Sequence, residues 1–303
     1  MNGVLVLDKP KGITSMQAVS AVNRILKVRK SGHTGTLDPF ATGVLPICIN
    51  QATKIIPFLS GGFKKYDAVM ELGVTTDTLD ETGRVLEERE VPELSENTVI
   101  DVFSKYKGKI NQVPPMYSAV KKDGVRLYKY ARKGIELDRK PREIFIKEIE
   151  LLEFSPPSLR FMVECSRGTY IRVLASDVAQ ELGCGGHLKE LRRTMSEGFS
   201  IDEAVSFEDL EMGLQRVTDL NDSLPHLPSV NVTENLAKEI REGKQIRISH
   251  LDTEAPPYFK TGDLVKIYEG GDLVSITEAL ADSSDIGSLD DDEVLLKLLR
   301  VFN

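Results

Sequence analysis

The stretch at residues 32–46 constrains the fold of this chain more than any other. It holds three glycines and two prolines. Glycine reaches backbone angles closed to other residues and proline fixes its own, so we expect a loop of defined shape. Asp38 is the only carboxylate in the stretch. Such a loop carries a functional group on a rigid scaffold, or it is a turn capped by its own Asp side chain, and the stretch alone leaves both open.

The chain of 303 residues is long enough for two domains with a large core. No apolar run approaches the roughly 20 residues that cross a bilayer. The first residues lack the basic flank of a secretory signal. Cys48, Cys165 and Cys184 are far apart in the sequence, so a reducing cytoplasm is expected rather than a disulfide framework or a zinc site.

The net charge of −8 hides an uneven distribution. Residues 201–303 hold 9 Lys and Arg against 22 Asp and Glu, whereas residues 1–200 hold 30 against 25. Binding to phosphates needs a local basic face and not a basic chain. An acidic total therefore does not exclude a nucleic-acid partner, although a charged stretch is often only a solvated surface.

Periodic apolar patterns predict an α+β chain. Helical spacing predicts an amphipathic helix at 15–27, where Thr14 and Gln17 have capping-box spacing. Lys9 and Lys11 precede this helix, and three cations, Lys27, Arg29 and Lys30, lie at its end. The five side chains could together contact phosphates, or the last three could simply be favoured by the partial negative charge at the helix C-terminus. Further elements are expected as strands at 4–7, 44–49, 65–72, 144–154 and 159–165, and as helices at 52–59, 95–106 and 171–182.

A proline-rich stretch near 220–229 marks a boundary. The residues after it predict a small β-rich module, with a helix at 232–242 and strands at 245–248, 264–268, 273–276 and 295–301. Residues 282–292 are expected to form an acidic, disordered-looking hairpin. Residues 187–193 are expected to be only a short segment after the helix.

Residues 111–142 mix aromatic and basic side chains. Tyr117, Tyr128 and Tyr130 alternate with Lys121, Lys122, Arg126, Lys129, Arg132 and Lys133. Bases stack on aromatic rings while Lys and Arg contact phosphates, so this mixture favours a nucleic-acid contact.

Two other site types, a calcium site and a nucleotide-binding loop, are not supported by the sequence. Residues 75–83 lack the spacing of a calcium loop, and no glycine-rich stretch is followed by the Lys-Ser/Thr of a nucleotide-binding loop.

Five blocks in order resemble the TruB family of tRNA pseudouridine synthases. They are NGVLVLDKP at 2–10 with Gly12 and Ser15, GHTGTLDP at 32–39 followed by ATGVLP at 41–46, Lys65-Tyr66, PMYSA at 115–119, and GTYIR at 168–172. The resemblance covers residues 2–195 and is faint beyond them. It implies a pseudouridine-synthase fold with a mixed, mainly antiparallel sheet and flanking helices, and a small β-rich PUA-like C-terminal domain. The implied domains are 1–228, with an RNA-gripping insertion at 111–142, and 229–303.

The resemblance also assigns roles to residues. Asp38 matches the catalytic aspartate and Arg172 matches the cation that would lower its pKa and hold it in place. Tyr66 matches the ring that stacks on the target base, and His33 a residue that holds this base out of its stack. Three further positions match contacts to the flipped uridine or supporting residues of its pocket, namely Tyr170, Leu191 and Lys9.

The implied activity is conversion of uridine 55 in the T-loop of tRNA to pseudouridine without a cofactor or a metal. The implied partner is the tRNA T-stem-loop, bound by a monomer that needs no protein partner and no membrane. Two alternatives remain open at this stage. The chain could modify another RNA, as relatives guided by small RNAs do, or it could use the same groove as an RNA-folding chaperone.

Overall fold

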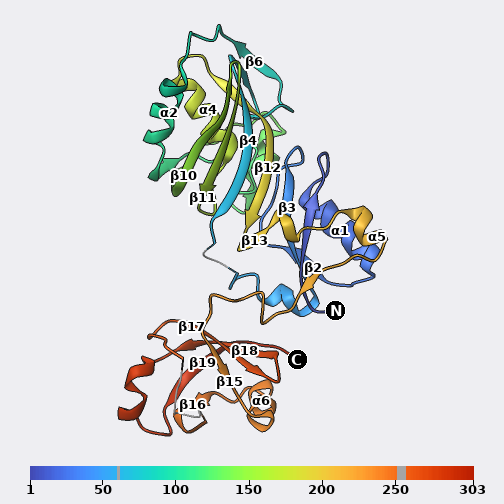
Figure 1. Cartoon of the computed structure of the whole chain (residues 1–303), viewed down its shortest axis with the longest axis vertical. Coiled ribbons are helices and arrows are strands. Elements are labelled where there is room, and N and C mark those ends of the chain that lie inside the picture. The colour runs from blue at the N-terminus through green and yellow to red at the C-terminus, as the bar shows by residue number, and fades with distance from the viewer. Residues whose placement is uncertain (60–61, 251–256) are drawn as a thin grey trace.

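A computed structural model of the chain describes residues 1–59, 62–250 and 257–303. Within these residues it contains two large sheets, one in each half of the molecule drawn in Figure 1, and two two-stranded sheets, β5-β6 and β8-β9. The larger sheet has the strand order β14-β1-β3-β12-β4-β11-β10-β7, with β2 paired to β3 and β13 to β12. Its strands are β1 (Gly3–Lys9), β2 (Ser31–His33), β3 (Thr42–Ile49), β4 (Lys64–Leu72), β7 (Gly108–Gln112), β10 (Arg142–Ser155), β11 (Ser158–Cys165), β12 (Gly186–Ser196), β13 (Phe199–Ser200) and β14 (Val217–Thr218).

Every pairing in this sheet is antiparallel except the one between β3 and β12. β3 and β12 approach closely there because residue 43 is a glycine. A Cβ atom at Gly43, whose φ is 98°, would lie 2.2 Å from the Arg193 carbonyl oxygen. The mixed, mainly antiparallel sheet with flanking helices that the sequence predicts is confirmed.

Helices cover the large sheet on the face that holds the main core. The helices α2 (Glu96–Lys105) and α4 (Ile171–Glu181) lie beside this sheet (Figure 1). Their buried apolar side chains share one core with residues of β4, β11 and β10. The helix α1 (Ser15–Leu26) begins with the predicted capping box between Thr14 and Gln17. The remaining elements of this half are η1 (Asn50–Lys54), β5 (Val74–Thr76), β6 (Val85–Glu88), β8 (Lys121–Lys122), β9 (Val125–Arg126), α3 (Leu127–Ala131), η2 (Ile201–Glu203) and α5 (Phe207–Glu211).

The C-terminal sheet has the order β15-β17-β18-β19-β16 and carries one α-helix. Its elements are β15 (Ser229–Asn231), α6 (Glu234–Arg241), β16 (Ile246–Arg247), η3 (Ile248–His250), β17 (Leu264–Glu269), β18 (Asp272–Ala279), η4 (Ser283–Ser288) and β19 (Val294–Val301). This is the small β-rich module that was expected, and its likeness to a PUA domain stays a prediction. The first residue of its sheet is Ser229, and the domain division at 228/229 stays a prediction.

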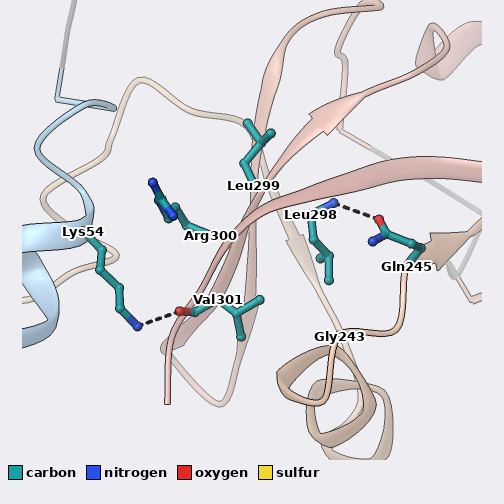
Figure 2. Close-up of a pocket in the computed structure, with 7 residues that line it drawn as sticks. All are labelled: Lys54, Gly243, Gln245, Leu298, Leu299, Arg300 and Val301. Atoms are coloured by element: carbon teal, nitrogen blue, oxygen red, sulfur yellow. Dashed lines mark hydrogen bonds between the residues drawn. The ribbon is translucent and has the colours of Figure 1, made fainter.

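Apolar and polar contacts join the two halves. Val4, Val44 and Cys48 of the large sheet share one buried cluster with Leu273 and Phe302 of the module. Figure 2 shows a cavity of about 400 Å³ at this junction, lined by Lys54, Gly243, Gln245, Leu298, Leu299, Arg300 and Val301. Across it the Lys54 ammonium donates to the Val301 carbonyl at 2.9 Å.

Three local predictions were wrong and a fourth was right only in part. The short helix expected at 52–59 is the 3₁₀-helix η1 (Asn50–Lys54), followed by turns. Residues 282–292 are not a disordered hairpin, because the Asp282 carboxylate accepts hydrogen bonds from Thr261 and η4 follows it. The segment at 187–193 is the middle of β12, a central strand of 11 residues. The first strand runs on through Lys9, beyond the turn that was expected after residue 7.

Candidate active site

The glycine- and proline-rich stretch forms the connection between β2 and β3, and both neighbours of Asp38 are fixed by earlier residues. The Leu37 amide donates to the Ser15 hydroxyl at 2.8 Å, and this hydroxyl donates back to the Leu37 carbonyl. The Lys9 ammonium donates to the Pro39 carbonyl at 3.3 Å. Asp38 itself keeps about a third of its side chain exposed. The loop therefore presents one carboxylate on a rigid backbone.

Arg172 lies at the first turn of α4 and is nearly buried. Its Nε donates to Asp38 Oδ2 at 2.8 Å and its Nη2 to Asp38 Oδ1 at 3.4 Å. This two-pronged geometry fixes the orientation of the carboxylate as well as its position. The other guanidinium hydrogens go to the Thr78 carbonyl at 2.6 Å and the Tyr117 carbonyl at 2.9 Å.

A second carboxylate, which sequence reasoning missed, completes the environment of Arg172. Asp80 Oδ2 lies 3.5 Å from Arg172 Nη1, and its side chain is 6% exposed. Asp80 Oδ1 accepts hydrogen bonds from the Thr78 hydroxyl and from the amide and hydroxyl of Thr82. The polar loop at 75–83 was weighed only as a metal site, and nothing local showed that Asp80 reaches Arg172.

The pKa of Asp38 shows two opposing effects. Burial raises the pKa of its carboxyl above the ordinary value, and the charge of Asp80 adds to this. The Arg172 guanidinium lowers it, as expected, but does not outweigh burial. The predicted effect of Arg172, to lower the pKa of Asp38 and to hold the carboxylate, is present, although burial raises the pKa by more. The ion pair fixes the geometry of the carboxylate rather than making it unusually acidic.

Two tyrosines face the same site. Tyr66 lies in β4, 7% exposed, directly opposite Arg193 of β12. Burial raises the pKa of Tyr66 to about 12, and the Asp38 charge adds to this shift. Tyr170 precedes α4, and Gln112 clamps its backbone by accepting from the amide at 2.8 Å and donating to the carbonyl at 3.1 Å. The Asp38 charge also raises the pKa of Tyr170, after burial.

The other predicted site residues lie around this centre in different ways. Lys9 is fully buried, and its ammonium donates to the carbonyls of Pro10, Ile13 and Pro39. Lys9 therefore stabilises the backbone of the loop. It cannot contact phosphates at the surface, as one of the two interpretations of the sequence proposed. Leu191 lies in β12 and lines, with Phe40, a cavity of about 600 Å³.

His33 ends β2 and is partly buried. Burial lowers its pKa, with the charges of Arg193 and Lys64 acting in the same direction. A lowered pKa favours the neutral form of His33 at pH 7 in the free protein.

The basic insertion is a surface feature. β8 and β9 form a short hairpin followed by α3, and the Arg132 guanidinium lies over the Tyr128 ring at 5.4 Å from its centroid. Five of the six cations named above are exposed, and Lys122 is partly exposed. The Tyr117 carbonyl, near the start of this insertion, accepts a hydrogen bond from Arg172.

No helix within the described residues is long and apolar enough to cross a membrane.

Comparison with known proteins gives end-to-end matches. The family model described as TruB family pseudouridylate synthase (N terminal domain) matches residues 23–171. The model of the tRNA pseudouridylate synthase B C-terminal domain matches residues 172–227. Proteins named tRNA pseudouridine synthase B are similar over the whole chain. That of Syntrophus aciditrophicus is 43% identical over 100% of this chain and 99% of its own, and that of Geobacter sulfurreducens is 41% identical over 100% of both.

Two solved structures share the architecture across both halves. A chain of an H/ACA RNP bound to a substrate RNA containing 2′-deoxyuridine matches with a TM-score of 0.76 and 27% identity. The match covers 99% of this chain and 85% of that one. A chain of a Cbf5–Nop10–Gar1 complex matches with a TM-score of 0.75 and 28% identity over 99% of this chain and 84% of the other.

Proposed function

Because this chain belongs to the TruB family of pseudouridylate synthases, we propose that it isomerises uridine 55 in the T-loop of tRNA to pseudouridine. The observation that carries the proposal is the Asp38 carboxylate held by Arg172 at 2.8 Å on a clamped loop, in a chain that matches tRNA pseudouridine synthase B end to end. The enzyme is an isomerase, so the substrate uracil stays in the product.

The reaction places definite demands on the site. The bond from C1′ to N1 of the base breaks, the uracil turns, and C1′ bonds to C5. C5 then gives its proton to solvent, and N1, which kept the electron pair of the broken bond, takes a proton up. Every atom but that exchanged proton is kept, and no redox partner is needed. Asp38 acts either as the nucleophile at C1′ or as the base at C2′. Its part-exposed side chain on a rigid loop suits both routes.

The neighbouring residues supply position and recognition. Arg172 holds the carboxylate of Asp38, and Tyr66 stacks on the flipped base. Tyr170 and the backbone of Leu191 contact that base, while His33 on β2 keeps it out of the T-loop stack. Lys9 supports the loop from below through the Pro39 carbonyl.

The RNA reaches this site along the basic insertion. Exposed cations of residues 111–142 contact phosphates, and Tyr128 and Tyr130 offer rings for stacking. The acidic module at 229–303 contributes modestly to affinity, and the protein acts as a monomer on the T-stem-loop in the cytoplasm without a protein partner, membrane, metal or cofactor.

Asp38→Asn tests the catalytic role. Asparagine keeps the shape and polarity of the side chain but is neither a nucleophile nor a base, so we expect tritium release from tRNA labelled at uridine C5 to fall at least about 1000-fold. Affinity for tRNA, measured by fluorescence anisotropy, should change little. Asp101→Asn, at an exposed position of α2, is the matched control. Turnover retained by the Asp38 variant would refute the assignment.

A guide-dependent substrate is the second candidate, because the chain also shares its fold with a chain of an H/ACA RNP. An isolated T-stem-loop separates the two. A stand-alone tRNA enzyme converts its uridine at a rate near that of tRNA, whereas a guide-dependent enzyme leaves it unmodified.

A further inference from the structure

A second group of charged side chains surrounds Gly35, three residues before Asp38 in the same loop. Arg193 Nη2 donates to the Gly35 carbonyl at 3.1 Å. A Cβ atom at Gly35 would lie 2.7 Å from Lys64 Nζ and 3.6 Å from Arg193 Nη1. We call Lys64, Arg167, Arg193 and Glu197, with the loop at 33–35, the Gly35 cluster. A side chain at residue 35 would collide with the Lys64 ammonium. The Lys64 side chain is 12% exposed and Arg193 is fully buried, so Lys64 is the cation of the cluster nearest to solvent.

The charges of the Gly35 cluster do not balance. Glu197 Oε1 lies 2.9 Å from Arg167 Nε and 3.8 Å from Lys64 Nζ, so one carboxylate serves two cations. Arg193 is fully buried, and within the described ranges no carboxylate forms an ion pair with it. Burial lowers the pKa of Lys64 to about 8, and the charges of Arg193 and Arg167 contribute to this. Uncompensated buried charge is costly, so the cluster lacks an anion.

Several buried hydrogen-bonding atoms in the Gly35 cluster and beside it in the chain have no partner. Among the residues that the structure describes, they are Arg193 Nη1, His33 Nδ1, Thr34 Oγ1, Ser196 Oγ and one oxygen of the cluster's own carboxylate, Glu197 Oε2. Thr34 precedes Gly35, and Ser196 lies opposite Lys64 in the pairing of β12 with β4. Buried polar atoms are nearly always satisfied in a working protein. A guanidinium, an ammonium and hydroxyl groups together are the donors that a phosphate oxygen accepts from.

The position of the cluster identifies the anion as part of the RNA. Lys64 and Tyr66 are two residues apart in β4, so their side chains lie on the same face of the sheet. Arg193 is directly opposite Tyr66. A nucleotide whose base stacks on Tyr66 and whose sugar lies at Asp38 therefore has its backbone beside Gly35.

We propose that the Gly35 cluster binds the phosphodiester group next to the flipped uridine. This inference rests on the proposed function and adds to it a phosphate site separate from the basic insertion. Lys64 and Arg193 donate to the phosphate oxygens, and Glu197 keeps Lys64 and Arg167 in place while the site is empty.

Lys64→Gln tests the site, because Lys64 reaches the surface and the substitution keeps a side chain of similar length. Lys65→Gln is the matched control, since the next residue of a strand points to the opposite face. The affinity for a T-stem-loop is measured against salt concentration. We expect the Lys64 variant to bind about tenfold more weakly near 0.1 M salt, with a slope of log affinity against log salt that is shallower by about 0.7. The Lys65 variant should match the wild type.

A scan of neutral methylphosphonates through the T-loop identifies the phosphate. At one position, the methylphosphonate should weaken RNA binding to the wild-type protein about tenfold. The same RNA should bind Lys64→Gln as well as unmodified RNA does, because this variant already lacks the ammonium that contacts the phosphate charge. Equal losses in both proteins at every position, or an unchanged salt slope, would overturn the phosphodiester site. So would inorganic phosphate that stabilises the wild type at millimolar concentration and stays bound when RNA is added.

The outcome is separable from the test of the proposed function. A wild-type protein that releases no tritium from the T-stem-loop contradicts the proposed function. A wild-type protein that releases it while Lys64→Gln keeps its full salt slope contradicts the phosphate site alone. Thermal unfolding of each variant shows whether its fold is intact.

Discussion

Two buried arginines beside the same loop have opposite surroundings. Arg172 is 3% exposed and donates to Asp38 and to two backbone carbonyls, with Asp80 3.5 Å away. Arg193 is 0% exposed and donates to the carbonyls of Val44 and Gly35 at 2.7 and 3.1 Å. Within the described residues, only Arg172 of the two forms ion pairs with carboxylates.

The difference separates two uses of a buried guanidinium. An arginine whose donors and charge are matched by protein groups has a structural role. Removing it leaves the neighbouring buried carboxylates to repel each other without a counter-charge. An arginine held by neutral carbonyls keeps its full charge and one free edge. Arg172 therefore positions a protein group, and Arg193 is left to meet an anion that arrives with the substrate.

The largest expected effect is on Arg172→Lys. A single ammonium cannot reproduce the two-pronged contact with Asp38 and the bonds to the Thr78 and Tyr117 carbonyls. We expect single-turnover tritium release to fall about 100- to 1000-fold, with tRNA affinity reduced much less. Arg193→Lys keeps the positive charge but loses the unpartnered Nη1 donor that we assign to the phosphate, so its main loss should be in affinity and not in the rate of the chemical step. Equal kinetic losses in the two variants would remove the distinction between the two arginines.

Asp80→Asn should produce the next largest effect. The amide removes the negative charge beside Arg172 and turns one acceptor into a donor among the groups of Thr78 and Thr82. We expect kcat to fall about 10- to 100-fold with little change in KM, because Arg172 loses part of its support and no substrate contact is removed. Asp77→Asn, an exposed carboxylate three residues earlier, is the control. A change in KM alone would mean that Asp80 contacts RNA.

Local chemistry explains what the sequence predicted. The capping box at Thr14, the strands at β4, β10 and β11, and the helix α4 each follow from side chains within a few positions of each other. The pairing of Asp38 with Arg172 spans 134 positions, and only the family resemblance suggested it. Its geometry is present, and its catalytic role remains a proposal.

The parts that were missed depend on distant partners or irregular strands. β12 has register shifts between Leu188 and Glu190 and between Arg193 and Met195, which break the alternation that marks a strand in sequence. The sequence therefore predicted only a short segment at 187–193. Asp80 and Arg193 become meaningful only through partners far away in the chain, such as Gly35, which is 158 positions from Arg193.

The Gly35 cluster also predicts a pH effect of a few-fold. In the free protein the pKa of Lys64 is about 8, and its charged neighbours are Arg193, Arg167 and Glu197, with Cys165 and His33 nearby. Only the protonated ammonium binds a phosphate, so T-stem-loop affinity should fall as pH rises from 7 to 9. Lys64→Gln should lose most of this pH dependence. Binding titrations at constant ionic strength measure it, and an identical pH profile in the variant would exclude Lys64 as the titrating group.

The smallest effect on RNA binding is expected at Lys9. Lys9 is a useful comparison for Arg193, because it too is a buried cation whose hydrogen bonds go only to carbonyls. Its three donors are all used, by Pro10, Ile13 and Pro39, whereas Arg193 has Nη1 to spare. Lys9→Met should lower the free energy of unfolding by about 1–3 kcal/mol, because buried carbonyls lose their partner. Urea unfolding measures this change. The slope of log RNA affinity against log salt concentration should stay unchanged, because the Lys9 ammonium has no free donor with which to bind a phosphate. A shallower slope in this variant would show that buried charge alone, without a free donor, is enough to attract the RNA.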